Sequence, residues 1–586
     1  MKKSILFFIL LIIISLGLSA CDRSWVIEVD GYTLHKTDGK YYIAQIPDSA
    51  REESVYEIPT RVGEYEIYGF GSTRSYGIWA GGEEIQFGYI RKLVIKSHIK
   101  SVYFDTYKHL LIETEQPLSE INWNLRSFDR YNGFYFLSPK KEYDVYYVDE
   151  SDCYDGIIYE NKNNGFAKVL FNYSNEFIIH DEHKGIVVNE IGESSFYESN
   201  IKELKIPNNI SKISDYAFQC STLEKVVFND NIVKIGKNAF ERCRLKELNL
   251  PNVELEIDSY AFANNKISYL EIPENISKID DYAFSNNEIE SFKFESKYIN
   301  HISTGMFSGC PLTGELNYGE YINSIGNSAL SNNDREELVI PDSISNFGNI
   351  SYCDNLKKIY LPNTSIKVGS FTYLDNLEEI HLGGTSNLDN FKKMYSVNNL
   401  KLFTVSEDNE YLYVNNGILY DKKTDAIVKC PPKLEIEKIE INTKPYDDAF
   451  ADNIYLKEAI ANCELSEGLF SYCVNLEKVQ LHSSIKIIPR VTFFACYSLK
   501  DINLNDVVEV GEQAFYKCES LNKVDLSNCE IVDNKAFKEC NLYEVIFTSK
   551  IKEIRNRAFA NNKKLKKCNY FNATLGEQAF YDTSIK

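Results

Sequence analysis

The sequence is poor in the residues that dominate several classes of protein. Of its 586 residues only 29 are Gly and 14 are Pro, and Met and Trp occur three times each. A collagen-like or low-complexity chain would be rich in Gly or Pro, so both classes are excluded. Basic residues are outnumbered as well, with 64 Lys and Arg against 85 Asp and Glu and a net charge of −21. We therefore expect no binding to nucleic acid or to anionic membranes, because either needs a basic face.

The motifs of common catalytic and metal sites are also missing. The chain has no Walker loop, no Gly-rich dinucleotide fingerprint, no Gly-x-Ser-x-Gly elbow and no His-Glu-x-x-His. His180-Asp181-Glu182-His183 is the most metal-like cluster, but it follows the β-like Phe177-Ile178-Ile179. His residues three apart share a face on a helix and not on a strand, so a solvated loop is favoured over a metal site. We expect no catalytic residue, no metal and no cofactor.

Long apolar runs are absent after the first residues of the chain. Met1-Lys2-Lys3 precedes the apolar run Ser4–Leu18, which is shorter than the roughly 20 residues of a membrane span and is typical of a secretory signal. The run ends in Leu18-Ser19-Ala20-Cys21, which resembles the lipobox of bacterial lipoprotein precursors. The resemblance implies cleavage before Cys21 and a lipid on its thiol, which would hold the protein on the cell membrane, facing outside the cytoplasm. An ordinary signal peptide with a coincidental Cys is the alternative.

A repeat dominates the rest of the sequence. An Ala-Phe pair recurs at 22-residue intervals at Ala217-Phe218, Ala239-Phe240, Ala261-Phe262 and Ala283-Phe284, and again from Ala514-Phe515. Between the pairs runs the pattern apolar-x-x-apolar-x-apolar, whose last two apolar positions are two apart, as on a strand with one buried face. A Pro often ends this strand, and a segment with two Ile three apart follows before the next Ala-Phe pair.

One such coil cannot bury its own apolar residues, so neighbouring coils must stack on each other. The sequence therefore predicts a repeat solenoid of the α/β class. We expect a parallel sheet on one face and short helical or 3-10 turns, which carry the Ala-Phe pair, on the other. Phe240 is expected in the core between coils.

The repeat resembles that of the BspA-like leucine-rich repeat family of bacterial surface proteins. Leu204-Lys205-Ile206-Pro207, followed by Ile210, Ile213 and Ala217-Phe218, matches the family pattern almost position by position. Clear matches cover about Phe177–Asn300 and Asn475–Lys586. The resemblance implies a non-enzymatic surface protein that binds a protein on a host, in its matrix or on another bacterium.

Breaks in the repeat suggest the organisation of the chain. Asn416-Gly417 between two apolar runs is a strong hairpin signal, and a similar hairpin interrupts BspA-like arrays. We expect a signal peptide at 1–20, an N-terminal cap with diverged repeats at 21–156, a leucine-rich repeat array at 157–402, a β-hairpin-like insertion at 403–432 and a second array at 433–586.

Thirteen Cys residues follow Cys21, and several are periodic. Those that stand three residues after the repeat Phe are Cys243, Cys310, Cys473, Cys496, Cys518 and Cys540. Equivalent positions in adjacent coils lie about 4.7–4.9 Å apart, which permits a disulfide by backbone distance. Stacked side chains point in parallel, however, so we favour buried, reduced thiols over disulfides, and both over metal binding.

Outward positions of the strands are the candidate binding face of the solenoid. They include Lys225, Glu247, Tyr269, Glu271, Lys358, Tyr360, Glu379, His381, Lys478 and Asp501. A solvated sheet also needs mixed polar residues, so no single position identifies a site.

The working hypothesis is a monomeric, lipid-anchored protein of the cell surface that binds or adheres to a protein ligand. A glycan-binding lipoprotein is the first alternative, because the chain has 41 Tyr and aromatic faces suit sugars. An enzyme with its site in residues 21–156 is the second. A purely structural role is also open.

Overall fold

The computed structural model describes residues 25–37, 39–51, 55–70, 91–96, 99, 101–104, 110–116, 121–125, 134–137, 146–147, 152–162, 164–174, 177–385, 394 and 396–585. The chain divides into two compact units, unit 1 (Met1–Phe284) and unit 2 (Ser285–Lys586), each of which is described by itself. The predicted signal peptide and Cys21 lie outside the described residues.

Two sheets form the first part of unit 1. One has the order β1 (Trp25–Val29), β2 (Tyr32–Thr37), β3 (Lys40–Gln45), β6 (Tyr65–Phe70), β8 (Ser101–Phe104) and β10 (Asn122–Leu125), with β5 (Arg61–Val62) beside β6. The other has the order β12 (Tyr146–Tyr147), β11 (Phe134–Leu137), β9 (Leu110–Thr114), β7 (Lys92–Ile95) and β4 (Val55–Glu57). Strands β1 to β3 form an antiparallel meander, and the pairs from β3 to β10 and throughout the second sheet are parallel. Leu34, Phe70, Leu93 and Ile112 pack together in their common core.

The solenoid of unit 1 begins with an antiparallel segment. Strands β13 (Cys153–Tyr154), β14 (Ile157–Asn161) and β15 (Ala167–Asn172) pair in this way, and β16 (Glu182–His183) forms a hairpin with β17 (Ile186–Ile191). Parallel pairing then runs from β15 through β17, β19 (Lys212–Ile213), β21 (Lys234–Ile235) and β22 (Leu255–Ile257) to β24 (Ile276–Ile279). On a separate side of the coils lie β18 (Glu203–Lys205), β20 (Lys225–Val227) and β23 (Tyr269–Ile272).

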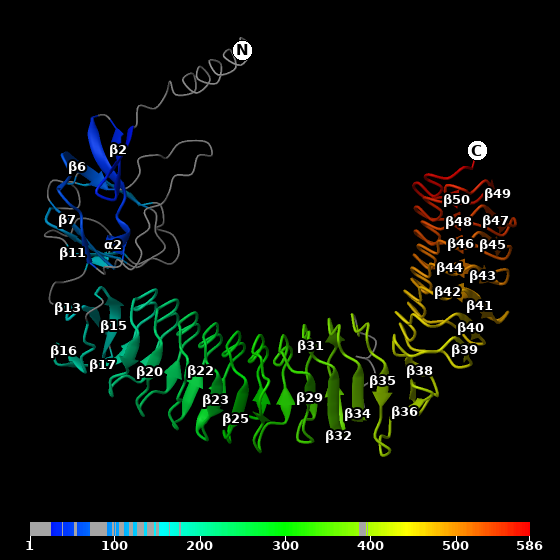
Figure 1. Ribbon diagram of the computed structural model, residues 1–586, viewed down its shortest axis with the longest axis horizontal. Helices are drawn as coiled ribbons and strands as arrows, with labels where there is room; N and C mark the ends of the chain where they lie inside the picture. Colours follow the sequence, from blue (N-terminus) through cyan, green and yellow to red (C-terminus); the bar gives the residue numbers. More distant parts are fainter. Residues whose placement is uncertain are drawn as a thin grey trace, which may run out of the picture. The chain divides into compact units, whose positions relative to one another are not determined.

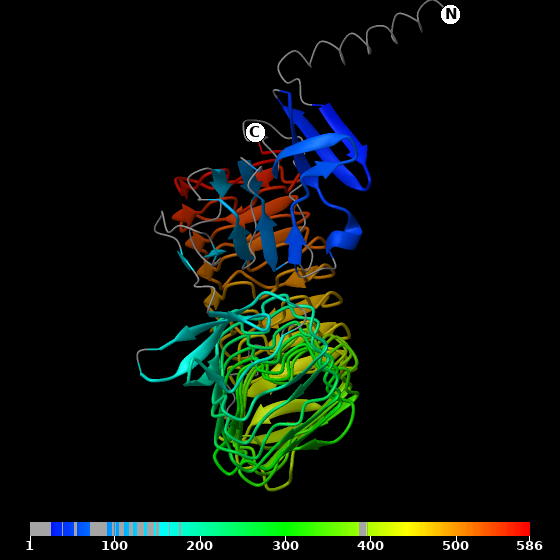
Figure 2. The same cartoon turned by 90° about the vertical axis from the view of Figure 1, so that its left-hand side faces the viewer.

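Each regular coil therefore contributes two short strands, one to each of two parallel sheets. The longer one, such as β20, carries the apolar-x-x-apolar-x-apolar pattern, and we call the sheet of these strands the first sheet. The other, such as β19, ends on the second Ile of the two-Ile segment and belongs to the second sheet. Figure 1 shows these strands side by side along each unit, and Figure 2, in which many coils are viewed close to end on, shows the chain of a coil closing around an interior.

Unit 2 repeats this arrangement. Its first sheet consists of four groups of paired strands. The first two groups are β25 (Ser291–Phe294) with β27 (Leu316–Asn317), and β29 (Glu337–Val339), β32 (Lys358–Val368), β34 (Glu379–Thr385) and β35 (Leu402–Thr404). The other two are β39 (Lys438–Ile441), β40 (Glu458–Ala461), β41 (Lys478–Leu481) and β43 (Asp501–Ile502), and β45 (Lys523–Leu526), β47 (Glu544–Phe547) and β49 (Lys567–Cys568). Its second sheet runs through β26 (His301–Ile302), β28 (Ser324–Ile325) and β30 (Asn346–Phe347) to the end of β32, and later through β42 (Ile487–Ile488), β44 (Glu509–Val510), β46 (Ile531–Val532), β48 (Glu553–Ile554) and β50 (Thr574–Leu575). The short pair β31 (Ile350–Ser351) and β33 (Phe371–Thr372) lies on the turn side.

A three-stranded antiparallel sheet interrupts unit 2. It consists of β36 (Leu412–Asn415), β37 (Ile418–Asp421) and β38 (Ile427–Lys429). Asn416 and Gly417 form the turn between β36 and β37, and both have positive φ, as a two-residue hairpin turn of this dipeptide requires.

The segment that carries the Ala-Phe pair is not helical, which corrects the prediction from the sequence. In the described residues the only α-helix is the four-residue α2 (Asp48–Arg51). The backbone N–H groups of Tyr216, Phe218 and Cys220 donate to the carbonyls of Lys237, Ala239 and Glu241 in the next coil. Tyr216 and Cys220 have φ of 59° and 60°, and these left-handed residues, four apart, prevent a continuous helix. The solenoid of parallel strands is confirmed, but the α/β class and its helical turns are not.

The repeat Phe residues stack through the core, as predicted. In unit 1 the ring centroids of Phe218 and Phe240 are 5.0 Å apart, and those of Phe240 and Phe262 are 5.2 Å apart. Phe240 is fully buried. In unit 2 the same stack continues from Phe450 to Phe580. Each ring therefore packs against the coil before and the coil after it, which makes the coils interdependent.

The periodic Cys residues lie beside this stack. The Cys243 thiol donates to the carbonyl of Phe218 at 3.1 Å, and in the next coil the amide of Asn265 donates to the carbonyl of Phe240 at 2.8 Å. All thirteen Cys residues after Cys21 are free, and the periodic ones are buried, as the sequence predicts. Burial raises the pKa of Cys243 to about 12, so this thiol is protonated at neutral pH.

Arg91 lies at the start of the ladder of hydrogen bonds between coils in unit 1. Its side chain is 2% exposed and lies over the Phe171 ring, with 4.5 Å from the guanidinium carbon to the ring centroid. Its guanidinium donates to the carbonyls of Asn172 (2.9 Å), Ser195 (3.0 Å) and Tyr197. The carbonyls of Ser195 and Tyr197 correspond in the repeat to the acceptors Ala239 and Glu241. The backbone N–H of Asn172 also donates to the Ser195 carbonyl at 2.9 Å, so Arg91 acts as a cap chiefly at the carbonyl of Tyr197, where an unpaired buried carbonyl would be costly.

Candidate binding face of the solenoid

The outward residues predicted in unit 1 lie on the first sheet or beside it. Lys225 is in β20, Tyr269 and Glu271 are in β23, and Glu247 lies in an extended segment between these strands. The Lys225 ammonium is 3.9 Å from the Glu247 carboxylate. Tyr269 is 48% exposed, whereas Glu271 is half-buried.

The predicted residues of unit 2 include four that lie together. Lys358 and Tyr360 on β32 are in register with Glu379 and His381 on β34. The Lys358 ammonium is 3.3 Å from the Glu379 carboxylate, whose hydrogen bond and charge raise the pKa of Lys358. The Tyr360 and His381 rings are 6.0 Å apart at 40°, and the structure thus brings these four side chains side by side.

The same register adds residues that the sequence analysis missed. Val339 on β29 pairs with Tyr360, and Leu402 on β35 pairs with Glu379. Val339 is 59% exposed and Leu402 is 37% exposed, so two aliphatic side chains face solvent beside Tyr360 and Glu379. Thr404 on β35 accepts or donates a 2.7 Å hydrogen bond with His381 Nδ1. We call Val339, Lys358, Tyr360, Glu379, His381 and Leu402 the central patch.

The remaining predicted residues belong to a row of alternating charge. Lys478 on β41 lies between Glu458 on β40 and Asp501 on β43, and its ammonium is 3.7 Å from the Asp501 carboxylate. The row also contains the pairs Lys438–Glu458 (3.5 Å) and Lys523–Glu544 (2.9 Å). Such exposed pairs contribute about 0–1 kcal/mol each. Because each charge already has an opposite neighbour, this part of the sheet presents little unpaired charge to a ligand.

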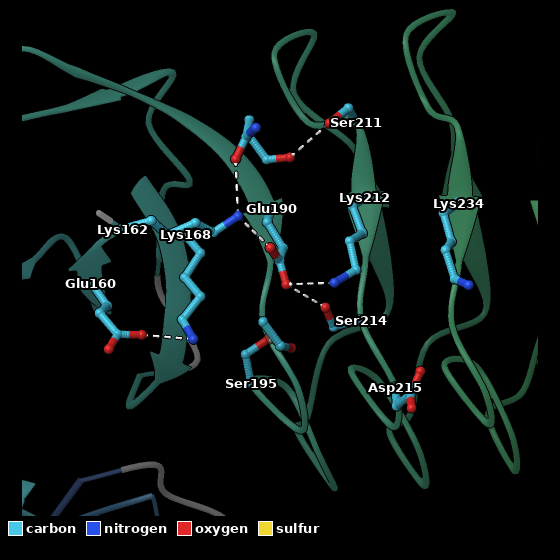
Figure 3. Close-up of polar contacts among 12 residues, drawn as sticks. Glu160, Lys162, Lys168, Glu190, Ser195, Ser211, Lys212, Ser214, Asp215 and Lys234 are labelled. Carbon is cyan, nitrogen blue, oxygen red and sulfur yellow. Dashed lines mark hydrogen bonds and ion pairs between the residues drawn. The ribbon is translucent and has the colours of Figure 1, made fainter. Parts of the chain in front are cut away.

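Charges on the second sheet are also paired between coils. Glu190 on β17 has a side chain that is 12% exposed and accepts hydrogen bonds from Lys162, Lys212 (3.2 Å) and Ser214 (Figure 3). Burial raises the pKa of Glu190, but these donors outweigh it and hold the pKa below its ordinary value. Glu160 forms a separate ion pair of 2.6 Å with Lys168. The cluster therefore joins adjacent coils to each other, and we interpret it as a structural contact and not as a ligand site.

The two His residues of the metal-like cluster do not converge on one point. His180 Nε2 is 2.7 Å from the Asp155 carboxylate, and His183 Nε2 is 3.0 Å from that of Asp152. The His183 ring is buried and stacks on Tyr159 with a centroid distance of 4.7 Å. The described part of the chain contains no group of three or more His, Cys, Asp or Glu residues arranged to hold a metal.

The stacked coils, with an apolar-x-x-apolar-x-apolar strand in each, define a leucine-rich repeat protein. Residues 171–268, 234–353, 281–401, 350–447 and 463–586 match the profile of the BspA type leucine-rich repeat region (6 copies). The matches cover more than half of the chain, and the chain belongs to this family, as its sequence predicts.

Several solved structures are similar to this chain. A leucine-rich repeat protein from Bacteroides ovatus is 22% identical, with a TM-score of 0.28 over 73% of this chain and 91% of that one. One from Eubacterium ventriosum is 18% identical, with a TM-score of 0.30 over 72% and 92%. A leucine rich cell surface protein from Faecalibacterium prausnitzii is 17% identical, with a TM-score of 0.28 over 72% and 93%. Comparison with curated proteins gives no match.

No helix within the described ranges is long and apolar enough to cross a membrane.

Proposed function

We propose that this protein is an exported, lipid-anchored, non-enzymatic surface protein that binds a protein ligand on the central patch of its first sheet. The observation that carries the proposal is the composition of the patch. Exposed Val339 and Leu402 lie with the rings of Tyr360 and His381, and the Lys358–Glu379 pair is beside them. Protein interfaces combine such an apolar and aromatic centre with a polar rim.

The surrounding rows support this location by contrast. Along β39 to β49 the positions equivalent to Lys358, Glu379 and Leu402 alternate in charge and pair with each other, as at Lys478 and Asp501, whereas the central patch places the exposed Leu402 in this row. Covering exposed aliphatic side chains with a ligand removes apolar surface from water, which is favourable. Covering charges that are already paired brings no such gain in binding free energy.

Export and anchoring are proposed from the sequence of the first residues. A charged start, an apolar run to Leu18 and the box Leu18-Ser19-Ala20-Cys21 support a lipid on Cys21. Cys21→Ala should release the protein from the membrane fraction or leave an uncleaved precursor, as fractionation and mass spectrometry of the N-terminus would show. Normal processing and retention of this variant would contradict lipid anchoring.

A binding screen tests the proposed function. Purified residues 22–586 would be applied to surfaces coated with fibronectin, laminin, collagen and fibrinogen, to a bacterial surface extract and to a glycan array. We expect saturable binding to at least one of the proteins. Binding to glycans alone would favour the glycan alternative, and turnover of a glycan would favour an enzyme.

A further inference from the structure

A surface hollow lies in the first part of unit 1, far in sequence from the central patch. It has a volume of about 640 Å³ and is lined by Gly39, by the first residues of β3 and by residues of β5, of β6 and of the turn between them. Strand β3 pairs with β6 so that Tyr41 is opposite Ile67, and β5 pairs with β6 so that Arg61 is opposite Glu66. The pairing therefore fixes both sides of the hollow to the same strand.

Three tyrosines supply the aromatic part of the lining. Tyr41, Tyr65 and Tyr68 are half-buried, and Tyr41 and Tyr65 also pack against the core of the first two sheets. The centroids of Tyr41 and Tyr65 are 4.8 Å apart, and their planes meet at 51°. Because the two rings are tilted and not stacked, neither covers the other completely. Aromatic faces of this kind pack against the C–H groups of a sugar ring, which are apolar.

Donors and acceptors are balanced around these rings. Lys40 and Arg61 are basic, and Glu64 and Glu66 are acidic, so the charged side chains of the lining sum to zero. Arg61 Nη2 donates to the carbonyl of Glu64 at 3.0 Å, which holds the guanidinium beside the hollow. The Lys40 ammonium lies 3.8 Å from the centroid of Tyr68.

This combination discriminates between classes of ligand. A phosphate or nucleotide would need an excess of positive charge, and a lipid would need an apolar lining. A sugar has an apolar ring face and hydroxyl groups that both donate and accept, so it uses rings, cations and carboxylates together. We infer that the hollow binds a neutral pyranose unit of an oligosaccharide. This site is independent of the protein ligand proposed for the central patch.

The test uses residues 22–586 and defined sugars. Saturation-transfer NMR and calorimetry would be run with cellobiose, maltose, lactose and N,N′-diacetylchitobiose, with glucuronic acid and glucose 6-phosphate as anionic comparisons. We expect at least one neutral disaccharide to bind. Tyr65→Ala should raise its Kd at least tenfold, and so should Glu66→Gln combined with Arg61→Met, which changes only exposed side chains.

The control separates this site from the central patch. Val339→Ser, Tyr360→Ser and Leu402→Ser together should leave sugar binding within twofold of the wild type. The inference is overturned if no neutral sugar binds, if only the anionic sugars bind, or if both sets of hollow variants bind normally. Release of monosaccharide would also overturn it, because the site would then be catalytic.

Discussion

Glu190 shows how single residues connect one coil to the next. Its carboxylate lies between Lys162 and Lys212 and also accepts from Ser214, so three segments depend on one charge (Figure 3). No sequence pattern identifies this cluster, because Lys162 belongs to the irregular start of the array. The outward positions of the strands were predicted from the sequence, whereas the pairing of their charges required the register.

We predict that the stability contribution of Glu190 depends on pH. Its folded-state pKa is lowered from an ordinary value of 4.5, so the contribution is complete above about pH 4.5 and is lost as the pH falls through the lower, folded-state pKa. Glu190→Gln should reduce the free energy of unfolding by about 1 kcal/mol at pH 7, and by progressively less below pH 4.5. Denaturant melts between pH 3 and pH 7 measure this difference.

Glu160→Gln is the matched control, because the Glu160 side chain is 50% exposed in its pair with Lys168. An effect below about 0.5 kcal/mol is expected there. A loss at Glu190→Gln that does not change with pH would show that the carboxylate charge is not responsible.

At the scale of elements, the sequence predicted the longer strand of each coil but not the rest. The pattern around Leu223 and Val226 has the period of a strand, and β20 forms there. The second strand is often only two residues long, as in β19, and two residues cannot show a period. The turn after it was predicted to be helical, but its left-handed residues, such as Tyr216, exclude a helix, and because they are not Gly no sequence signal marks them. Hydrogen bonds to the next coil maintain this conformation, and they are not visible in a single repeat.

The Phe stack predicts a local response to a core mutation. Phe240 is fully buried between Phe218 and Phe262, so Phe240→Ala should reduce the free energy of unfolding by about 3–5 kcal/mol. Limited proteolysis should cleave first around residues 218–262, because the lost packing destabilises the adjacent coils most. Val233→Ala, at a position that is 53% exposed, should change stability by less than about 0.5 kcal/mol. Unchanged stability of the Phe240 variant would exclude a stacked core.

The Arg91 cap predicts which part of unit 1 opens first. Arg91→Met preserves much of the side-chain volume but removes the donors to Asn172, Ser195 and Tyr197. We expect a loss of about 2–4 kcal/mol, with faster hydrogen exchange in residues 186–199 than in residues 255–279. The exposed Arg242→Met is the control. Uniform exchange across both segments would mean that Arg91 does not act as an end cap.

At the scale of the whole molecule, the repeat made the fold predictable, but it also made the outward positions of all coils look equivalent, so the central patch could not be located from the sequence. Lys358, Tyr360, Glu379 and His381 were among ten outward positions that the sequence could not rank. Val339 and Leu402 lie in coils that match the repeat less clearly, and only the register of β29 to β35 places them beside Tyr360 and Glu379. The aromatic hollow of unit 1 was not predicted, because its residues come from two hairpins without a motif.

The affinity of a patch variant for the protein found in the binding screen tests the central claim most directly. Val339→Ser, Tyr360→Ser and Leu402→Ser together remove the apolar and aromatic surface of the central patch. Val233→Ser, Ile487→Ser and Leu575→Ser remove aliphatic side chains of 43–54% exposure elsewhere and serve as the control. With both variants folded by circular dichroism, surface plasmon resonance should give a Kd at least tenfold higher for the patch variant and unchanged for the control. Equal affinity of the patch variant and the wild type would contradict the account.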